Sequence, residues 1–154
     1  MSAPAAWSGS LAARVWSWLQ ARGLDPTAHP DEAVAALSLA GEDGAVLSGY
    51  VQVREAAEQV LVYLEAPWLV PADRLGAVAS VVAQINWALP IGNLELNGNG
   101  QLRCRTSVDL EGVTLDDGSL GELMESLVGA CHSVLTDAID PIAATIDGDT
   151  PNLP

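Results

Sequence analysis

The chain has 154 residues, a formal net charge of −14 and a hydrophobic fraction of 49%. This length is typical of one domain that buries a substantial core. Twenty acidic residues face six basic ones, all arginine and scattered along the chain, so the charge disfavours binding to nucleic acids and to anionic membranes. Lysine is absent, which excludes Schiff-base chemistry and a pyridoxal cofactor held by a lysine.

The pattern of apolar residues also bears on the compartment. No run of about 18 apolar residues occurs, so no segment is expected to cross a bilayer. The first residues lack the basic and apolar regions of a signal peptide. We therefore expect a cytoplasmic protein.

The first half of the chain predicts one helix and three strands. Apolar residues recur at helical spacing over residues 7–22, and Trp16 is expected to point away from that apolar stripe. Residues 24–31 are expected to form a connecting loop. The last of the three strands has no polar face, so we expect the second face of the sheet to be covered as well. The three strands are predicted at 33–40, 45–54 and from residue 60 to Pro67, which should end the last one.

The second half predicts a helix, a hairpin and a long final helix. The second helix should bury a stripe from Leu75 to Leu89, and an Asn-Gly-Asn-Gly turn at 97–100 should join two strands, with positive φ at its glycines. Ser119 and Glu122 have the spacing of a capping box that opens the last helix. The Asp140-Pro141 pair is expected to kink or nearly end that helix.

These elements follow the order α-β-β-β-α-β-β-α. Consecutive hairpins favour an antiparallel five-stranded sheet with helices packed on it, which is an α+β domain. Residues 1–148 should form this single domain, and residues 149–154 a disordered tail.

The segment from the second helix to the hairpin resembles the YbjN family of bacterial sensory transduction regulators. The resemblance is carried by Gln84-Ile-Asn86, by Pro90-Ile-Gly92, by Asn93-Leu-Glu-Leu96 and by the strand at 101–112, and it continues into the closing helix. It implies a fold similar to that of type III secretion chaperones. It also implies a domain without known catalytic residues, often dimeric, whose relatives bind protein segments.

The remaining polar residues do not form a recognisable reactive site. His29 and His132 lack the spacing of a catalytic triad, and Asp147-Gly-Asp149 lacks the positions of a calcium loop. Cys104 and Cys131 fall on apolar faces and are expected to be buried thiols. We therefore predict no catalytic, cofactor-binding or metal-ligating residue, and we expect the Asn86 amide to tie its helix to the hairpin corner.

Aromatic residues outside the apolar stripes suggest an additional buried surface. We expect either a homodimer contact or a groove for a partner peptide. The leading hypothesis is a non-catalytic protein-binding domain, a regulator or chaperone-like adaptor that acts as a homodimer. The alternative is a sensor of a small apolar ligand, which a closed apolar cavity would favour, and an uncharacterised enzyme comes third. The candidate interface residues are Trp16, Tyr50, Leu61, Tyr63, Trp68 and Trp87.

Overall fold

The computed structural model describes residues 4–40, 46–151 and 153. Within these residues, six antiparallel strands form one sheet in the spatial order β1-β2-β3-β4-β6-β5. The prediction of an α+β domain is confirmed, whereas the prediction of five strands is wrong. The strands are β1 (Thr27–Ala28), β2 (Val34–Ala40), β3 (Val46–Arg54), β4 (Gln59–Leu69), β5 (Asn93–Leu96) and β6 (Gln101–Asp109).

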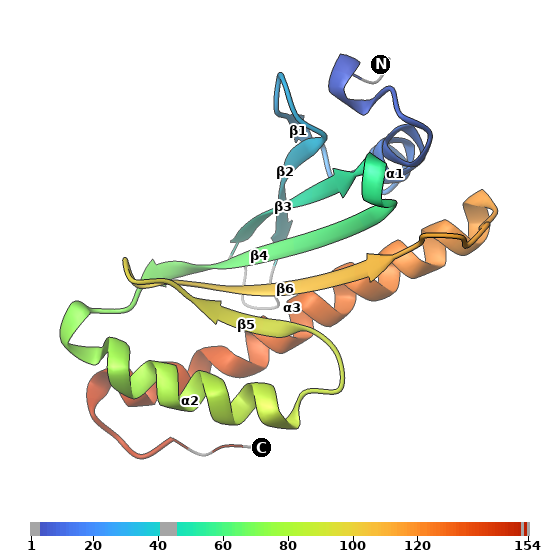
Figure 1. The fold of residues 1–154 in the computed structure, drawn as a ribbon. Coiled ribbons are helices and arrows are strands. Elements are labelled where there is room, and N and C mark those ends of the chain that lie inside the picture. Colours follow the sequence, from blue (N-terminus) through green and yellow to red (C-terminus); the bar gives the residue numbers. More distant parts are fainter. Residues whose placement is uncertain (1–3, 41–45, 152, 154) are drawn as a thin grey trace.

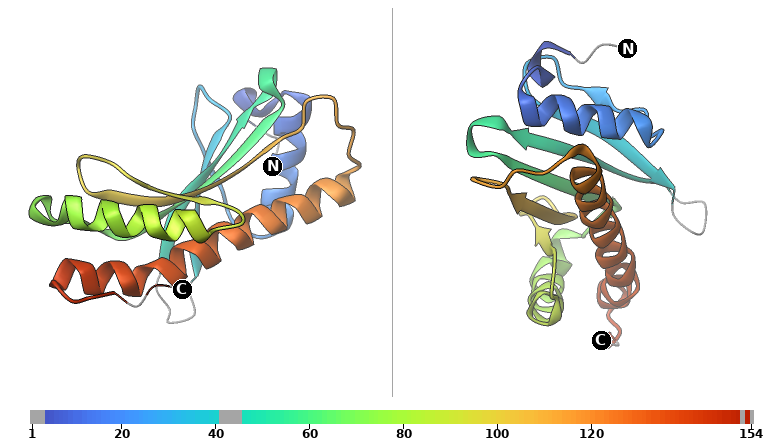
Figure 2. Two further views of the ribbon diagram at one scale, coloured as in Figure 1. Left: turned by 60° about the horizontal axis from the view of Figure 1, so that its bottom comes forward. Right: turned by 90° about the vertical axis from the view of Figure 1, so that its right-hand side faces the viewer.

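In the described part of the chain, three α-helices accompany the sheet, namely α1 (Ser10–Ala21), α2 (Leu75–Ala88) and α3 (Asp117–Asp147). Helices α1 and α3 lie against the same face of the sheet, while α2 lies beyond β5 and beside the second half of α3 (Figure 1, Figure 2). Single 3-10 turns precede α1, follow β3 and precede α2, and they are η1 (Ala5–Trp7), η2 (Glu55–Ala57) and η3 (Ala72–Arg74).

The additional strand β1 lies where the sequence predicted a loop. Thr27 and Ala28 pair with Ala36 and Ala35 of β2. Two residues between Pro26 and Pro30 are too short to show the period-2 alternation that identifies a strand.

Strand β4 continues past Pro67, where it was expected to end. The pairing of β4 with β6 changes register between Glu65 and Leu69, so the proline falls within this irregular stretch. A proline has no N–H to donate to a sheet, and it is tolerated where regular pairing is interrupted. Trp68 therefore belongs to β4 rather than to a linker before α2.

Helix α3 begins earlier and ends later than predicted. Its N-cap is Asp116, whose carboxylate accepts a hydrogen bond from the Ser119 amide at 2.7 Å, so Ser119 is not the capping residue. Pro141 lies inside the helix, which continues to Asp147. The proline ring is buried, as are Ile142 and Thr145 of the next turn, so packing against the rest of the protein holds the last turns in place.

The core lies between the sheet and the layer of α1 and α3. Alternate residues of β3 and of β6 are buried on this face, as their sequence pattern predicts. Cys104 and Cys131 are both fully buried, and the Cys131 thiol donates to the Cys104 carbonyl at 3.3 Å. The neighbouring Cys104 thiol, together with burial, raises the pKa of Cys131, which fits the predicted role of a buried thiol. The buried side chains of α3 include Leu120, Met124, Leu127, Cys131, Leu135 and Ile142.

The Asn86 side chain closes one edge of the sheet. Its amide nitrogen donates to the Leu94 carbonyl at 2.9 Å, and its amide oxygen accepts from the Leu94 N–H at 2.8 Å. Because β5 pairs only with β6 in the described strand order, these groups of Leu94 lie on its unpaired side. The predicted link between helix and hairpin is confirmed, and the amide takes the place of a neighbouring strand.

Replacing Asn86 by alanine should lower the free energy of unfolding by about 1–3 kcal/mol, because the two Leu94 groups lose their partners. Gln84→Ala on the exposed side of the same helix is the matched control, and it should change stability by less than about 0.5 kcal/mol. Urea denaturation of both variants measures the difference. Equal stability of the two variants would show that the Asn86 contacts contribute nothing.

The two glycines of the hairpin turn should respond differently to valine. Gly100 has a φ of +84°, and a β-carbon there would lie 2.2 Å from the Val70 carbonyl oxygen. Gly98 meets nothing within 4 Å and lacks a positive φ, which corrects the expectation for that position. Thermal melts should therefore show that Gly100→Val lowers the free energy of unfolding by about 1–3 kcal/mol. Gly98→Val should remain much closer to the wild type. A larger loss for Gly98→Val would contradict this account.

Candidate partner-binding surface

Three of the six candidate interface residues are buried within the single chain. Trp16 is 5% exposed and its ring lies 5.1 Å from that of Trp7, so the expectation that Trp16 points away from the core is wrong. The reason is that α1 begins only at Ser10. Ser8 and Gly9 separate it from the turn η1, which places Trp7 beside Trp16. Leu61 and Tyr63 are also 5% exposed.

The face of the sheet opposite α1 and α3 carries an aromatic and charged cluster. Tyr50 of β3 stacks on Tyr63 of β4 with ring centroids 4.5 Å apart, and the Arg103 guanidinium lies 4.5 Å from the Tyr63 centroid. Arg103 also donates to the Tyr50 hydroxyl at 2.7 Å. Glu95 pairs with both Arg103 at 2.7 Å and Arg105 at 3.1 Å.

These side chains cover one another, so they shield this face of the sheet from water. Cross-strand stacking and the cation over the ring both stabilise such a cluster. Burial raises the pKa of Tyr50, which keeps its hydroxyl protonated beside Arg103. The expectation that this face is covered is confirmed at Tyr63 and Leu61, which are each 5% exposed, and the cover includes side chains of the sheet itself. Tyr63 and Leu61 are consequently weak candidates for a contact between molecules.

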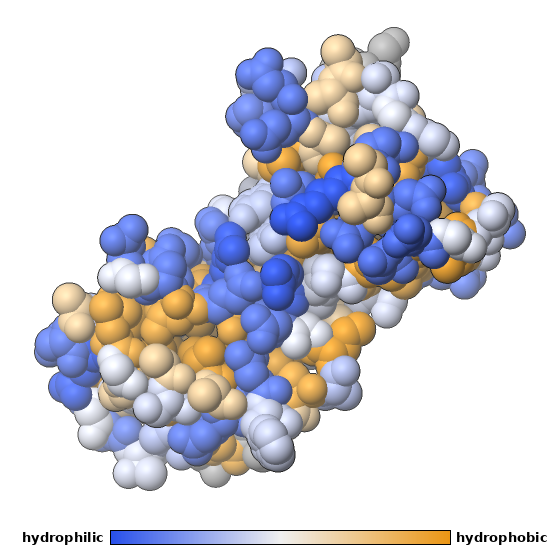
Figure 3. All heavy atoms as spheres, in the orientation of Figure 1, coloured by the Kyte–Doolittle hydropathy of each residue, from blue (hydrophilic) through white to orange (hydrophobic). Residues whose placement is uncertain are grey.

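Trp87 is the candidate residue that lies in solvent. It is 93% exposed near the end of α2, and Ile91 in the following corner is 47% exposed. Trp68 and Tyr50 are half-buried, and Trp68 lies beside the exposed Leu69 and Val46. In the space-filling view, hydrophobic residues gather over the part of the molecule that holds α2, and hydrophilic residues cross the middle of the sheet (Figure 3).

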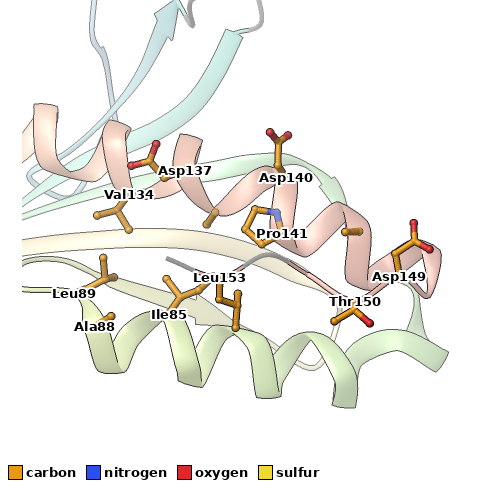
Figure 4. A pocket seen from close by; sticks show the side chains of 12 residues that line it. Ile85, Ala88, Leu89, Val134, Asp137, Asp140, Pro141, Asp149, Thr150 and Leu153 are labelled. Atoms are coloured by element: carbon orange, nitrogen blue, oxygen red, sulfur yellow. The ribbon is translucent and has the colours of Figure 1, made fainter.

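A groove of about 880 Å³ runs between α2 and α3, and the sequence did not predict it. We call it the α2–α3 groove. Ile85 and Leu153 point into the space between the helices, and Pro141 lies on its α3 side (Figure 4). A second hollow of about 460 Å³ shares Ile85 and Leu153 with the groove and extends to Trp87. The apolar surface therefore continues across α2 from the groove to the exposed tryptophan.

The sequence held partial signals for this groove. Ile85 and Leu89 were assigned to a buried stripe, and Pro141 was expected to kink or nearly end its helix. Leu153 is an isolated apolar residue in the tail that was expected to be disordered, and it packs against the core. An apolar residue such as Leu153, outside any predicted helix or strand, was therefore the signal in the sequence for a further apolar contact.

The described residues contain no further site of recognisable chemistry. No group of three or more histidine, cysteine, aspartate or glutamate side chains is placed to hold a metal within residues 4–40, 46–151 and 153. His29 lies in a loop, where its Nδ1 accepts from the Asp31 amide at 3.3 Å. His132 lies on α3 beside Trp18 and the Arg22–Glu125 ion pair. No helix within these residues is long and apolar enough to cross a membrane.

Solved structures match this chain at low sequence identity. The solved structure of YbjN from E. coli, described as a putative transcription regulator, matches with a TM-score of 0.60 at 11% sequence identity, covering 81% of this chain and 88% of that one. The solved ExsC–ExsE complex matches with a TM-score of 0.43 at 13% identity, covering 81% of this chain and 85% of that one. No curated protein matches the chain.

The family comparison covers most of the chain. The family model for YbjN, described as "Putative bacterial sensory transduction regulator", matches residues 11–139. The match extends from the second residue of α1 through the sheet and α2 into α3, so it includes both the hairpin and the Asn86 contact. The resemblance carried by the helix-to-hairpin segment is confirmed, and the chain belongs to the YbjN family.

Proposed function

We propose that the chain is a non-catalytic protein-binding domain, a regulator or chaperone-like adaptor that acts as a cytoplasmic homodimer. The single observation that carries this proposal is the 93% exposure of Trp87 beside a continuous apolar surface. Indole rings at the centre of protein interfaces contribute strongly to binding, and a soluble domain rarely leaves such a ring in water without a use. The regulatory description of the YbjN family agrees with this role.

The groove geometry favours a protein over a small apolar ligand. A ligand sensor requires a pocket that encloses most of the ligand surface. The α2–α3 groove is instead bordered by exposed residues such as Ala88, Asp137 and Asp140. Its shape suits side chains presented by another polypeptide.

Homodimer formation has to overcome electrostatic repulsion. Each chain carries a net charge of −14, so two copies repel one another at low ionic strength. Salt screens this repulsion, with a Debye length of about 10 Å at 0.1 M and about 3 Å at 1 M. The dimer should therefore strengthen as the salt concentration rises.

Sedimentation of the wild-type protein at low and high salt should show a monomer–dimer equilibrium that shifts toward the dimer with salt. Trp87→Asp should weaken the dimer about 30-fold or more, because it removes a central apolar contact and adds a charge. Trp87 makes few contacts within its own chain, so the variant should keep the wild-type melting temperature.

Val113→Asp is the matched control, since Val113 is 54% exposed in the loop before α3 and gains the same charge. It should leave the dimer largely intact. A wild-type protein that remains a monomer at every salt concentration would contradict the homodimer, and equal weakening by both variants would exclude Trp87 as its centre.

A further inference from the structure

The α2–α3 groove is occupied by a segment of the same chain. Leu153 of the tail is partly buried against the core and faces Ile85 of α2 (Figure 4). The tail reaches this position through Gly148, which ends α3 with a φ of +89°, and the Asp149 amide bonds the Ala144 carbonyl at 2.8 Å. The chain therefore turns back sharply at the end of α3 and places an apolar side chain in the groove.

The contact made by Leu153 is small for the size of the groove. A groove of about 880 Å³ is far larger than one leucine side chain, and the neighbouring Thr150 is exposed. Full burial of a leucine contributes only about 1.5–3 kcal/mol, and this leucine is not fully buried. A partner that offers two or more apolar side chains gains more than the tail provides, so it can displace Leu153.

The charges at the groove indicate the chemistry of that partner. Asp137 and Asp140 of α3 and Asp149 of the tail stand along one rim, with their carboxylates directed away from α2 (Figure 4). None of the described residues that line the groove is basic. Arg74 lies near the end of this rim, beside Gly148, and also lies 3.9 Å from Asp73. An apolar segment flanked by lysine or arginine complements this rim, since its cations face the carboxylates while its apolar side chains enter the groove.

The same charges disfavour a second copy of the chain as the occupant. A second copy brings another net charge of −14 toward three carboxylates, which adds repulsion at the position where the partner must fit.

We propose that the α2–α3 groove binds a basic, apolar polypeptide segment of a protein partner, and that Leu153 of the chain's own tail competes with that segment. This inference rests on the proposed protein-binding function and names its surface and its class of partner. The tail acts as a built-in competitor that reduces the apparent affinity by the fraction of time it occupies the groove.

The test uses the full chain and a fluorescent synthetic helical peptide made of leucine and lysine, with the same peptide carrying glutamate for lysine as its control. Fluorescence anisotropy should show binding of the lysine peptide, weakening with salt, and at least about ten-fold weaker binding of the glutamate peptide. Equal binding of both peptides would overturn the proposal. The proposal would also be overturned if neither peptide bound to the wild type or to the variant Leu153→Ser.

Two sets of variants separate the groove from general attraction to an acidic protein. Asp137→Asn with Asp140→Asn should weaken peptide binding about five-fold, whereas Glu111→Gln with Glu122→Gln, which removes the same charge from exposed positions outside the groove, should weaken it less than two-fold. Equal weakening by the two pairs would show that only the net charge attracts the peptide and would overturn the groove.

Leu153→Ser tests the competition, because it removes the apolar side chain and keeps the charge of the tail. This variant should bind the lysine peptide about two- to five-fold more tightly. Unchanged or weaker binding would overturn the role of Leu153 as a competitor.

Sedimentation without peptide reports the dimer separately. If the protein is a monomer that still binds the lysine peptide at the groove, only the homodimer hypothesis is contradicted. If the protein is a dimer that does not bind the peptide, only the proposal of a peptide-binding groove is contradicted.

Discussion

The packing of α3 across the sheet is the contact on which the rest of the fold depends. Helix α3 packs on β4 and β6 next to α1, which contacts β3, and its second half lies beside α2. The contact is specified by polar atoms as well as by apolar burial, because the buried Thr106 hydroxyl donates to the Leu127 carbonyl at 2.9 Å. An extra hydrogen bond to a helical carbonyl in the core fixes how far the helix can slide along the sheet. The position of α2, and thus of the groove, follows from this placement.

Several features followed directly from local sequence patterns. The alternation in β3 and β6 reports one buried face, and the Asn-Gly-Asn-Gly turn reports a hairpin, because both depend on neighbouring residues alone. The role of Asn86 could also be predicted from the sequence. A polar residue beside an apolar stripe at a helix end lies close to backbone groups with which its amide can form hydrogen bonds. The family could be recognised because its motifs lie in the same helix-to-hairpin segment.

Other features depended on contacts that no local pattern encodes. Strand β1 exists because β2 offers it partners, and Trp16 is buried because the turn at Ser8 and Gly9 places Trp7 against it. Tyr63 is covered by Tyr50 and Arg103, which come from other strands. Burial within the chain therefore removes Trp16, Leu61 and Tyr63 from the candidate interface and leaves Tyr50, Trp68 and Trp87. The groove was out of reach of sequence reasoning because α2, α3 and the tail form it together.

The amide of Asn86 also limits how sheets of different molecules can join. An unpaired strand edge is a template for another chain, but the Leu94 groups on the outer side of β5 already have partners. At the opposite side, β1 covers only two of the seven residues of β2. Extension of the sheet is therefore hindered at Leu94, and β2 is the more open of the two sides. Two copies that meet through β2 cover the more open edge of each sheet, which favours a closed pair over a fibre.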